Sequence, residues 1–410
     1  MVAPNSLSRV APLPATPLDA QGRPANTAGA TIDRPSPPAP PSAAKNELPS
    51  LPPPATSKAV TPRRLAGGEL AAVPQTPRTL KVCPPQAPKP GCEYFELAAA
   101  VAQAKPGDTV LLAPGIYQQA ALVTVSGITI RGEPGAHLKG RAIEGKAALV
   151  VRADDVIIDG IECSGIRVRD RNGACVRIEG RNITLRNVYF HDNQEGVLGG
   201  VGGYVLIEDS VFERNGFNGG FAHGLYIGRK VELFHFRRNK VLSTKHEGQG
   251  VKSRAIKTVI EDNIIAGLES RDSRAIDIPN GGEIVIRRNI LQKGPNSSNS
   301  QMIGLGLEGN LHSVNRAVIT ENIIIFDQNR PEWIDRVNEY LPIVPPRGTV
   351  VSSKIGGAVI VKDNVIVSAR EILTRSEIDP AQNQTFATRS QAGLPPFPAL
   401  PNSVSEFASN

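Results

Sequence analysis

Residues 259–264 read Val-Ile-Glu-Asp-Asn-Ile, and residues 285–290 read Val-Ile-Arg-Arg-Asn-Ile. The same phrase, in which apolar residues lead to Asn or a substitute and then to further apolar residues, occurs eight times between positions 156 and 365. Its anchors lie at positions 160, 187, 210, 239, 263, 289, 322 and 364, so the spacing is nearly regular up to 289 and longer for the last two. A period of about 20–30 residues with β-branched strands and Asn or Gly turns is typical of a solenoid.

One coil of this repeat cannot bury its own apolar face, whereas coils stacked at a strand spacing of about 4.8 Å bury it continuously. Asn at the anchor suits a tight corner because it tolerates the left-handed backbone conformation. Stacked in register, the Asn side chains can also bond one another along the solenoid. A β-sandwich does not predict one fixed motif that returns eight times. The sequence therefore predicts an all-β fold, a parallel β-helix over residues 81–372.

The segments on either side of the repeat differ from it in composition. Of the 35 prolines, 21 precede Cys92, and such a stretch cannot bury enough apolar surface to offset the entropy of ordering. We predict that residues 1–80 form a disordered Pro- and Ala-rich tether. Residues 96–104, with Leu-Ala-Ala-Ala-Val at 97–101, are predicted to form a helix that caps the open edge of the first coil. Residues 373–410 are predicted to form a polar C-terminal tail or cap.

The net charge of +7 belongs mostly to the N-terminal segment. Ten of the 46 basic and four of the 39 acidic residues precede Cys92, so the rest of the chain carries 36 basic and 35 acidic groups. The charge therefore gives no reason to expect a nucleic-acid partner, and an aromatic content of 4% leaves few stacking platforms. No apolar run approaches the length of a membrane span, and residues 1–10 lack the apolar core of a secretory signal.

The four cysteines fall as two near pairs. Cys83 and Cys92 bracket a Pro-rich turn. The sequence allows either a disulfide between them or two free thiols. Cys163 and Cys175 are equally well explained as buried cysteines that stack in the core. Paired cysteines favour an oxidising compartment. We therefore expect a periplasmic, secreted or cell-envelope protein, with the N-terminal tail as a possible envelope tether.

Residues 105–117 carry a resemblance to a known superfamily. They read Lys-Pro-Gly-Asp-Thr-Val-Leu-Leu-Ala-Pro-Gly-Ile-Tyr, which resembles the opening of pectate lyase-like β-helix proteins. These include lyases, epimerases and hydrolases of polysaccharides, and the resemblance extends over the whole of the predicted β-helix. It implies that the β-helix is right-handed and that the partner is a polysaccharide. Because one fold hosts many chemistries, it does not identify the reaction.

A second strand follows the anchor in five successive coils. Alternation of side chains along a strand predicts two columns and a leading edge. The inward column is Val197, Leu225, Val251, Ile276 and Leu305; the outward column is Leu198, Tyr226, Lys252, Asp277 and Gly306; Arg254 and Glu308 lie two residues further on; and the leading edge is Glu195, His223, Gln249 and Arg274. Coil stacking should bring Tyr226, Lys252 and Asp277 into contact in one row.

This row contains the groups that a uronic-acid lyase needs: a cation for the substrate carboxylate, a base for the C5 proton and a proton donor for the leaving oxygen. Arg254 or Arg274 suits the first role, Lys252 or His223 the second, and Tyr226 the third. The catalytic candidates are therefore Lys252, Tyr226, His223 and Arg254, and the substrate-binding candidates are Arg274, Asp277, Glu308, Gln249 and Glu195.

Residues 250–254, Gly-Val-Lys-Ser-Arg, look like part of the chondroitinase B and alginate lyase family. The resemblance implies that Lys252 is the base. That family presents Arg-His-Gly in the next coil as the acid, where this sequence has Ile-Pro-Asn-Gly at 278–281. Of the family's calcium ligands only Glu247 has a counterpart. The metal and any cofactor therefore stay unknown, with Ca²⁺ as the candidate.

The sequence favours a lyase or C5-epimerase on an acidic, uronate-containing glycan. An inverting glycoside hydrolase is the first alternative, since Asp277 and Glu308 are expected to lie roughly 8 Å apart. A non-catalytic, adhesin-like glycan-binding β-helix of the cell envelope is the second. A structural interpretation also stays open, in which Lys252 and Asp277 form a solvated ion pair worth under about 1 kcal/mol. His191 is expected to be a satisfied corner residue rather than a catalyst.

Overall fold

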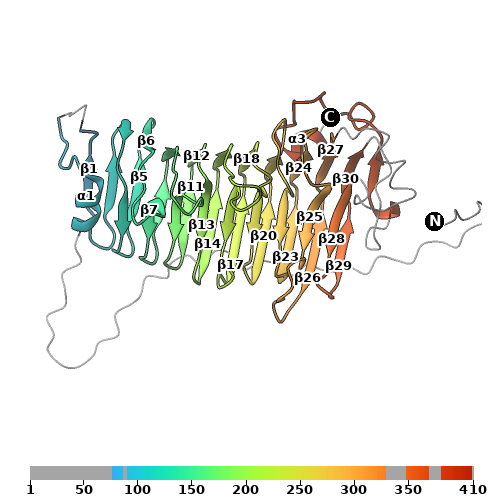
Figure 1. Ribbon diagram of the computed structural model, residues 1–410, viewed down its shortest axis with the longest axis horizontal. Helices are drawn as coiled ribbons and strands as arrows, with labels where there is room; N and C mark the ends of the chain where they lie inside the picture. Colours follow the sequence, from blue (N-terminus) through green and yellow to red (C-terminus); the bar gives the residue numbers. More distant parts are fainter. Residues whose placement is uncertain (1–75, 86–89, 329–347, 369–379, 409–410) are drawn as a thin grey trace, which may run out of the picture. The chain divides into compact units, whose positions relative to one another are not determined.

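The computed structural model describes residues 76–85, 90–328, 348–368 and 380–408. In each complete coil the chain passes through one strand of each of three sheets, here called A, B and C in the order in which the chain meets them. All pairings between neighbouring strands are parallel, and successive coils lie side by side along the long axis (Figure 1). The predicted parallel β-helix is confirmed.

Each sheet consists of strands from successive coils. Sheet A comprises β1 (Thr79–Val82), β2 (Thr109–Leu112), β5 (Thr129–Gly132), β8 (Ile157–Asp159), β11 (Ile183–Arg186), β14 (Tyr204–Glu208), β17 (Leu233–Arg237), β20 (Lys257–Glu261), β23 (Glu283–Arg287), β26 (Arg316–Thr320) and β29 (Val359–Lys362). Sheet B comprises β3 (Gly115–Tyr117), β6 (Ala136–Lys139), β9 (Glu162–Ser164), β12 (Tyr189–His191), β15 (Val211–Glu213), β18 (Lys240–Leu242), β21 (Ile264–Ala266), β24 (Ile290–Lys293), β27 (Ile323–Phe326), β30 (Val365–Ser368) and β31 (Gln384–Phe386). Sheet C comprises β4 (Ala121–Val123), β7 (Ala147–Val151), β10 (Ala174–Ile178), β13 (Glu195–Gly199), β16 (Leu225–Ile227), β19 (Val251–Ser253), β22 (Ile276–Ile278), β25 (Gln301–Leu305) and β28 (Thr349–Ser353).

The first coil is closed by the helix α1 (Leu97–Gln103), as the sequence predicts. Its buried face, which includes Leu97 and Val101, joins the main hydrophobic core. Sheet A begins at β1, and Arg78 just before that strand binds Asp108 with its side chain. Residues 1–75 of the predicted tether lie outside the described residues.

At the other end, β31 pairs with β30 and so extends sheet B by one strand. The 3₁₀ turn η1 (Pro380–Gln382) precedes β31, and the short helix α3 (Val404–Ala408) ends the described chain. Ala392 and Leu394 pack with the outer apolar residues of sheet B. In the described ranges, no helix has the length and apolar character needed to cross a bilayer.

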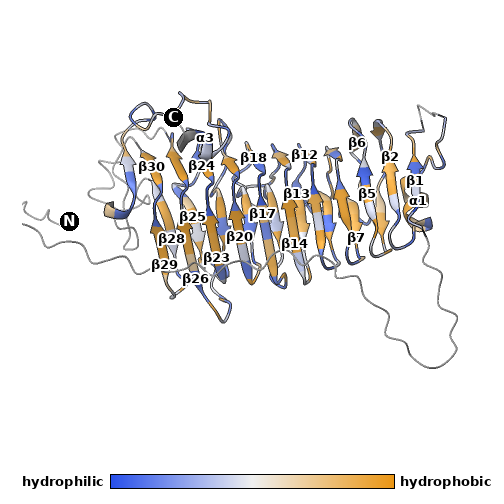
Figure 2. Cartoon of the chain, turned by 180° about the vertical axis from the view of Figure 1, so that it is seen from behind, coloured by the Kyte–Doolittle hydropathy of each residue, from blue (hydrophilic) through white to orange (hydrophobic). Residues whose placement is uncertain are grey.

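The core lies inside the coils, where inward side chains of the three sheets meet. Hydrophobic residues are concentrated on the strands, and the turns are more hydrophilic (Figure 2). Aromatic residues stack between neighbouring coils of the core, with Phe190 edge-on to Phe212 and Phe212 in contact with Phe236. Since each coil buries its inward residues on the next one, stability comes from nearest-neighbour contacts along the solenoid.

The turn between sheets A and B carries a ladder of buried asparagines. From the second member onward, each side-chain oxygen accepts hydrogen bonds from the backbone N–H and the side-chain amide of the asparagine one coil earlier. The members in order along the solenoid are Asn239, Asn263, Asn289, Asn322, Asn364 and Asn383. The predicted bonding of stacked Asn side chains is confirmed.

The backbone role expected of these asparagines is wrong. The left-handed residue is the one before the ladder position, for example Arg238, Asp262 and Arg288, with φ of 54°, 58° and 52°. Asn187, which the repeat counts as an anchor, has φ 54° and belongs to this left-handed position, so Val188 occupies the ladder position of its coil. Asn therefore suits the ladder positions because its inward side chain forms these hydrogen bonds, and not because it adopts a left-handed backbone conformation.

Both cysteine pairs form disulfides, Cys83–Cys92 and Cys163–Cys175, with Cα–Cα distances of 5.7 and 5.9 Å. The interpretation of Cys163 and Cys175 as stacking cysteines is therefore wrong. Both lie in the core cluster, but they belong to sheets B and C of one coil and cross-link its interior. The signal available in the sequence was their short separation, which is about half a coil.

We expect the double substitution Cys163→Ala and Cys175→Ala to lower the free energy of unfolding by about 3 kcal/mol, because it releases a closed loop of this length in the unfolded chain. Chemical denaturation of the oxidised protein measures the loss. The matched control is Cys83→Ala with Cys92→Ala, whose bridge lies at the first coil. A 163/175 variant as stable as the wild type would show that the cross-link contributes nothing.

Candidate functional site on sheet C

Two outward columns run along sheet C, separated by two consecutive residues that both face the core. The central column is Leu198, Tyr226, Lys252, Asp277 and Gly304, which are paired in register. The leading column, three residues earlier in each strand, is Glu195, His223, Gln249, Arg274 and Gln301. The columns converge: the rings of His223 and Tyr226 stack with centroids 6.0 Å apart, and Arg274 Nη1 lies 3.4 Å from Asp277 Oδ1.

The sequence-based alignment is correct for four of the five coils and wrong for the last. It places Leu305 beside Ile276, but Ile303 occupies that position and Leu305 pairs with Ile278. Gly304 therefore follows Asp277 in the outward column. A Cβ at Gly304 would lie 2.8 Å from Asp277 Oδ1, so glycine leaves the space in which Asp277 and Arg274 meet.

Lys252 lies at the centre of the cluster, between two carboxylates. Its Nζ donates to Glu308 Oε1 at 2.8 Å and lies 3.5 Å from Asp277 Oδ2. The Lys252 and Asp277 side chains are only 9% and 2% exposed, so the interpretation of this pair as a solvated surface ion pair is wrong. Burial raises the pKa of Asp277, although Arg274 and Lys252 act in the opposite direction.

Arg254 connects the rest of the cluster. Its Nε donates to the Tyr226 hydroxyl at 2.7 Å, its Nη1 donates to Asn280 Oδ1 at 2.8 Å, and its Nη2 pairs with Glu308 Oε2. Glu308 therefore accepts from Lys252 with one oxygen and from Arg254 with the other. Desolvation would raise the pKa of Glu308, but the hydrogen bonds from Lys252 and Arg254 outweigh it and lower the pKa. We call these five residues, Tyr226, Lys252, Arg254, Asp277 and Glu308, the sheet C cluster.

Glu308 belongs to a loop, residues 306–315, that folds back over earlier coils. Asn280 donates to the carbonyls of Gly309 and Asn310, and Arg229 donates to Asn310 O at 3.0 Å. His312 Nε2 lies 3.0 Å from Arg254 O. Sequence reasoning missed Asn280, Arg229 and His312, and its only signal was the lengthened gap between anchors 289 and 322.

The side chains of the leading column differ in how accessible they are to a ligand. Glu195 is buried, its Oε1 has no hydrogen-bond partner, and burial raises its pKa well above the ordinary range. Gln249 is also buried, and its Oε1 has no hydrogen-bond partner. Arg274 Nε donates to Gln301 Oε1 at 2.7 Å. In this conformation Arg274 is the member beside the cluster, and Glu195 and Gln249 lie beneath the surface.

His223 is buried behind the Tyr226 ring. Its Nδ1 accepts a hydrogen bond from the Gln249 backbone N–H, so a neutral ring carries its proton on Nε2. Burial first, and the nearby charge of Lys252 second, lower the pKa of His223 to about 3. His223 is therefore uncharged at neutral pH and orients Tyr226 by stacking.

This shift makes a prediction for acid stability. Between pH 6.5 and about 3 the unfolded chain binds a proton at His223 and the folded chain does not, so the free energy of unfolding falls as the pH drops through this window. We expect the wild type to lose on the order of 2–3 kcal/mol more than His223→Gln between pH 7 and 4.5. Denaturant unfolding at several pH values measures this difference. Parallel pH profiles for the two proteins would contradict it.

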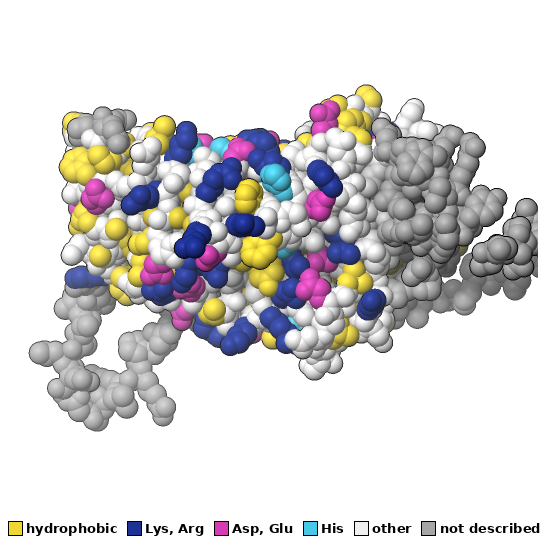
Figure 3. All heavy atoms as spheres, in the orientation of Figure 1, with side chains coloured by type: hydrophobic (Ala, Val, Ile, Leu, Met, Phe, Trp, Pro, Cys, Tyr) yellow, Lys and Arg dark blue, Asp and Glu magenta, His cyan; other side chains and the backbone are white. Residues whose placement is uncertain are grey.

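The residue expected to correspond to a calcium ligand, Glu247, forms an ion pair with Arg271 at 2.5 Å. Within the described ranges, the His, Cys, Asp and Glu side chains that gather closely enough for a metal ion do so on sheet B and not in the sheet C cluster. The charged residues on the face shown in Figure 3 are of both signs and interspersed.

The family model described as "Right handed beta helix region" matches residues 115–299. The predicted right-handed β-helix is thus confirmed as a fold. Solved structures that this chain resembles include pectate lyase Pel9A, with 17% identity over 75% of this chain and 82% of that chain and a TM-score of 0.47. The alginate lyase from Paenibacillus sp. str. FPU-7 is 18% identical over 76% of this chain and 96% of that one, with a TM-score of 0.43.

A third structure, the A-module of the Azotobacter vinelandii mannuronan C-5 epimerase AlgE6, is 14% identical over 71% of this chain and 93% of that chain, with a TM-score of 0.33. Similarity at this level concerns the fold alone. No match was found among curated proteins. The function therefore has to be argued from the site.

Proposed function

We propose that the protein is a polysaccharide lyase or C5-epimerase that acts on a uronate-containing glycan at the sheet C cluster. One observation carries this proposal: Lys252 and Arg254 converge on a single carboxylate, that of Glu308. Two cations around one carboxylate, next to a phenol and a buried acid, make up a binding site for a uronate. Glu308 occupies the position of the substrate carboxylate, on a side chain that is 46% exposed.

In the proposed reaction the uronate carboxylate displaces Glu308 and pairs with Arg254. Lys252 then retains Asp277 as its carboxylate partner, which holds the amine in place beside the bound sugar. The neutral Lys252 amine removes the C5 proton, and the cation beside the carboxylate stabilises the charge that develops. In a lyase the C4–O bond then breaks, a C4–C5 double bond forms and Tyr226 protonates the leaving oxygen. In an epimerase the C4–O bond stays intact, and Tyr226 donates its proton to C5 from the opposite face instead.

Incubation with a panel of uronate polymers tests the proposal. A lyase raises the ultraviolet absorbance through unsaturated ends, and an epimerase exchanges the C5 proton with solvent deuterium. New reducing ends without ultraviolet absorbance would instead support the hydrolase. Retention on an immobilised glycan with none of these signals would support a binding module. The structure does not favour the hydrolase, because Asp277 and Glu308 contact the same ammonium group rather than facing a water from two sides.

Glu308→Gln should bind a uronate oligosaccharide more tightly than the wild type, because the substrate no longer competes with an intramolecular carboxylate. We expect an affinity gain of roughly tenfold, the value of one charge-assisted hydrogen bond. Isothermal titration calorimetry at low salt measures it. The control is Glu321→Gln, a substitution of an exposed glutamate in an A–B turn. Weaker binding by the 308 variant would identify Glu308 as a substrate ligand.

The compartment is proposed on the chemistry of the cysteines. Both disulfides are stable in an oxidising environment, which supports a periplasmic, secreted or envelope location with the Pro-rich segment as a tether. Polymeric substrates of this class are met outside the cytoplasm. Labelling of free thiols in protein taken directly from cells tests the proposal, since a reduced protein would contradict it.

A further inference from the structure

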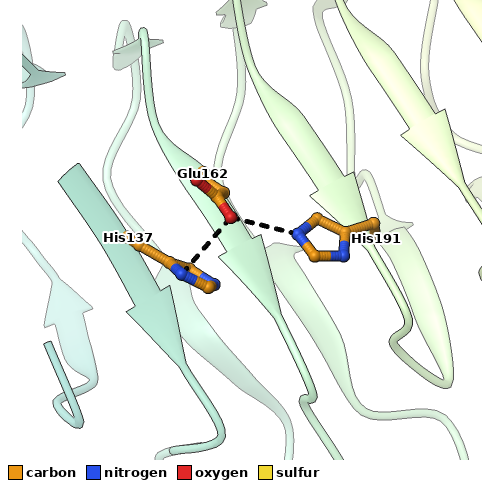
Figure 4. Close-up of side chains that lie close together, drawn as sticks. All are labelled: His137, Glu162 and His191. Atoms are coloured by element: carbon orange, nitrogen blue, oxygen red, sulfur yellow. Dashed lines mark hydrogen bonds and ion pairs between the residues drawn. The ribbon is translucent and has the colours of Figure 1, made fainter. Parts of the chain in front are cut away.

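Three side chains from neighbouring strands meet on the outer face of sheet B, away from the sheet C cluster. His137 on β6, Glu162 on β9 and His191 on β12 point toward one another (Figure 4). Glu162 Oε1 lies 3.3 Å from His137 Nδ1 and 3.2 Å from His191 Nε2. One ligand atom from each of the three lies within 4.8 Å of the others. All three are partly buried, so an ion can enter from solvent.

The outer hydrogen bonds of both rings fix their orientation. His137 Nε2 lies 2.7 Å from Ser164 Oγ, and His191 Nδ1 lies 2.9 Å from Asp192 Oδ2. Asp192 is itself held by Arg214 and Lys245, at 2.8 and 3.0 Å. Histidines that bind metals characteristically donate the other ring N–H to a carboxylate or another oxygen. Both rings therefore have the supporting contacts of metal ligands.

The two faces of the His191 ring have different partners. Nε2 faces Glu162, on the side where the three side chains meet, and Nδ1 faces Asp192 on the opposite side. His191 therefore has one nitrogen directed at the shared site and a carboxylate behind the other, which is the arrangement of a metal-binding histidine.

We propose that His137, Glu162 and His191 bind a divalent transition-metal ion, with Zn²⁺ as the best fit. Two imidazoles and one carboxylate suit zinc, whereas Ca²⁺ and Mg²⁺ take oxygen ligands. Three protein ligands leave a fourth position for water or an exogenous ligand. Because the ligands come from three successive coils, the ion joins β6, β9 and β12 across their outer face.

The site is separate from the proposed reaction, since it lies on a different sheet and uses none of the sheet C cluster. Few other cysteine or histidine side chains are arranged to bind zinc in the described part of the chain. The four cysteines are all in disulfides. Of the six histidines, His235 gives the best comparison: its Nε2 also faces a carboxylate, Glu261, at 2.7 Å, but no second histidine joins it within the described part of the chain.

Titration of the chelator-treated, tag-free full chain with Zn²⁺ in a calorimeter tests the proposal. We expect one site per chain in the wild type and in the matched control His235→Ala. Affinity should fall at least 100-fold in His137→Ala and His191→Ala, and about 10–100-fold in Asp192→Asn, which loses only a supporting contact. The conservative variant Glu162→Gln keeps the size of the side chain and guards against a loss of fold.

Two further measurements separate binding from folding. Co²⁺ should give the visible absorption of a tetrahedral site in the wild type and not in Glu162→Gln. Zn²⁺ should raise the melting temperature of the wild type and of His235→Ala, and not that of His137→Ala or Glu162→Gln. Equal zinc affinity in all variants, no zinc binding by the wild type, or loss in His235→Ala equal to that in His191→Ala would each overturn the proposal. None of these results depends on whether the protein cleaves a glycan.

Discussion

Lys252→Met should lower turnover of a uronate polymer by about 10²–10⁴-fold, the usual contribution of a positioned general base. Methionine keeps much of the length of the lysine and removes the nitrogen that lies between Asp277 and Glu308. Initial rates on the polymer that the substrate panel identifies measure the loss. A rate within a few-fold of the wild type would remove Lys252 from the reaction.

Two controls distinguish chemistry from folding in this experiment. Asp277 loses a buried partner in Lys252→Met but keeps Arg274 at 3.4 Å, and its raised pKa allows it to become neutral. The variant should therefore remain folded, which its melting curve checks. Lys252→Arg keeps a positive charge but no base of useful strength, so it should bind the glycan and fail to turn it over. Lys240→Met, an exposed position on sheet B, should be fully active.

The sequence predicts the architecture well because the same physical constraint acts in every coil. Alternating apolar residues and a fixed corner define which side chains face inward, and this places Tyr226, Lys252 and Asp277 in one row, as found. The alignment fails at Gly306 because it set Gly304 beside Ala275, a position that Met302 occupies. The earlier coils carry Gly or Ala there, so alignment on a small residue shifted this strand by two residues.

The sequence of the loops predicts less of the candidate site than the sequence of the strands does. The position of Glu308 depends on a loop that turns back by two coils to reach Lys252 and Arg254, and no local pattern encodes that path. The zinc candidate was missed for another reason. His137 pairs with Glu162, but His191 pairs with Ser164, two residues further along the strand. His137 also precedes the first anchor at position 160, so the strands that follow the anchors do not include it.

The start of the β-helix does not coincide with the end of the Pro-rich segment. The proline-rich character extends to residue 90, yet β1 already begins at Thr79 within it. Residues 78–82 are ordered by pairing with β2 and by the ion pair to Asp108, both of which are long-range contacts. A deletion designed to spare the fold should therefore end before Arg78.

Asn289→Ala should be the most destabilising of the substitutions considered for the repeat, at about 2–4 kcal/mol in the free energy of unfolding. Asn289 is fully buried, and its side-chain amide donates to Ile260 O, Arg287 O and Asn322 Oδ1 at 2.9–3.0 Å. Alanine leaves the backbone N–H of Asn263 without the acceptor that it has at 3.0 Å. Each buried polar group left unpaired costs about 1–3 kcal/mol, and a small cavity adds to this.

Chemical denaturation of the two proteins measures the effect, with Asn296→Ala as the control. Asn296 is exposed and makes one hydrogen bond, to Glu269 O, so its loss should stay within about 0.5 kcal/mol. Because the ladder runs through six consecutive coils, the break at Asn289 should also speed amide hydrogen exchange in β21 and β24 more than in β2 or β5, which lie several coils away. Uniform exchange along the chain would mean that the coils unfold together, and that the ladder stabilises the solenoid as one unit rather than coil by coil.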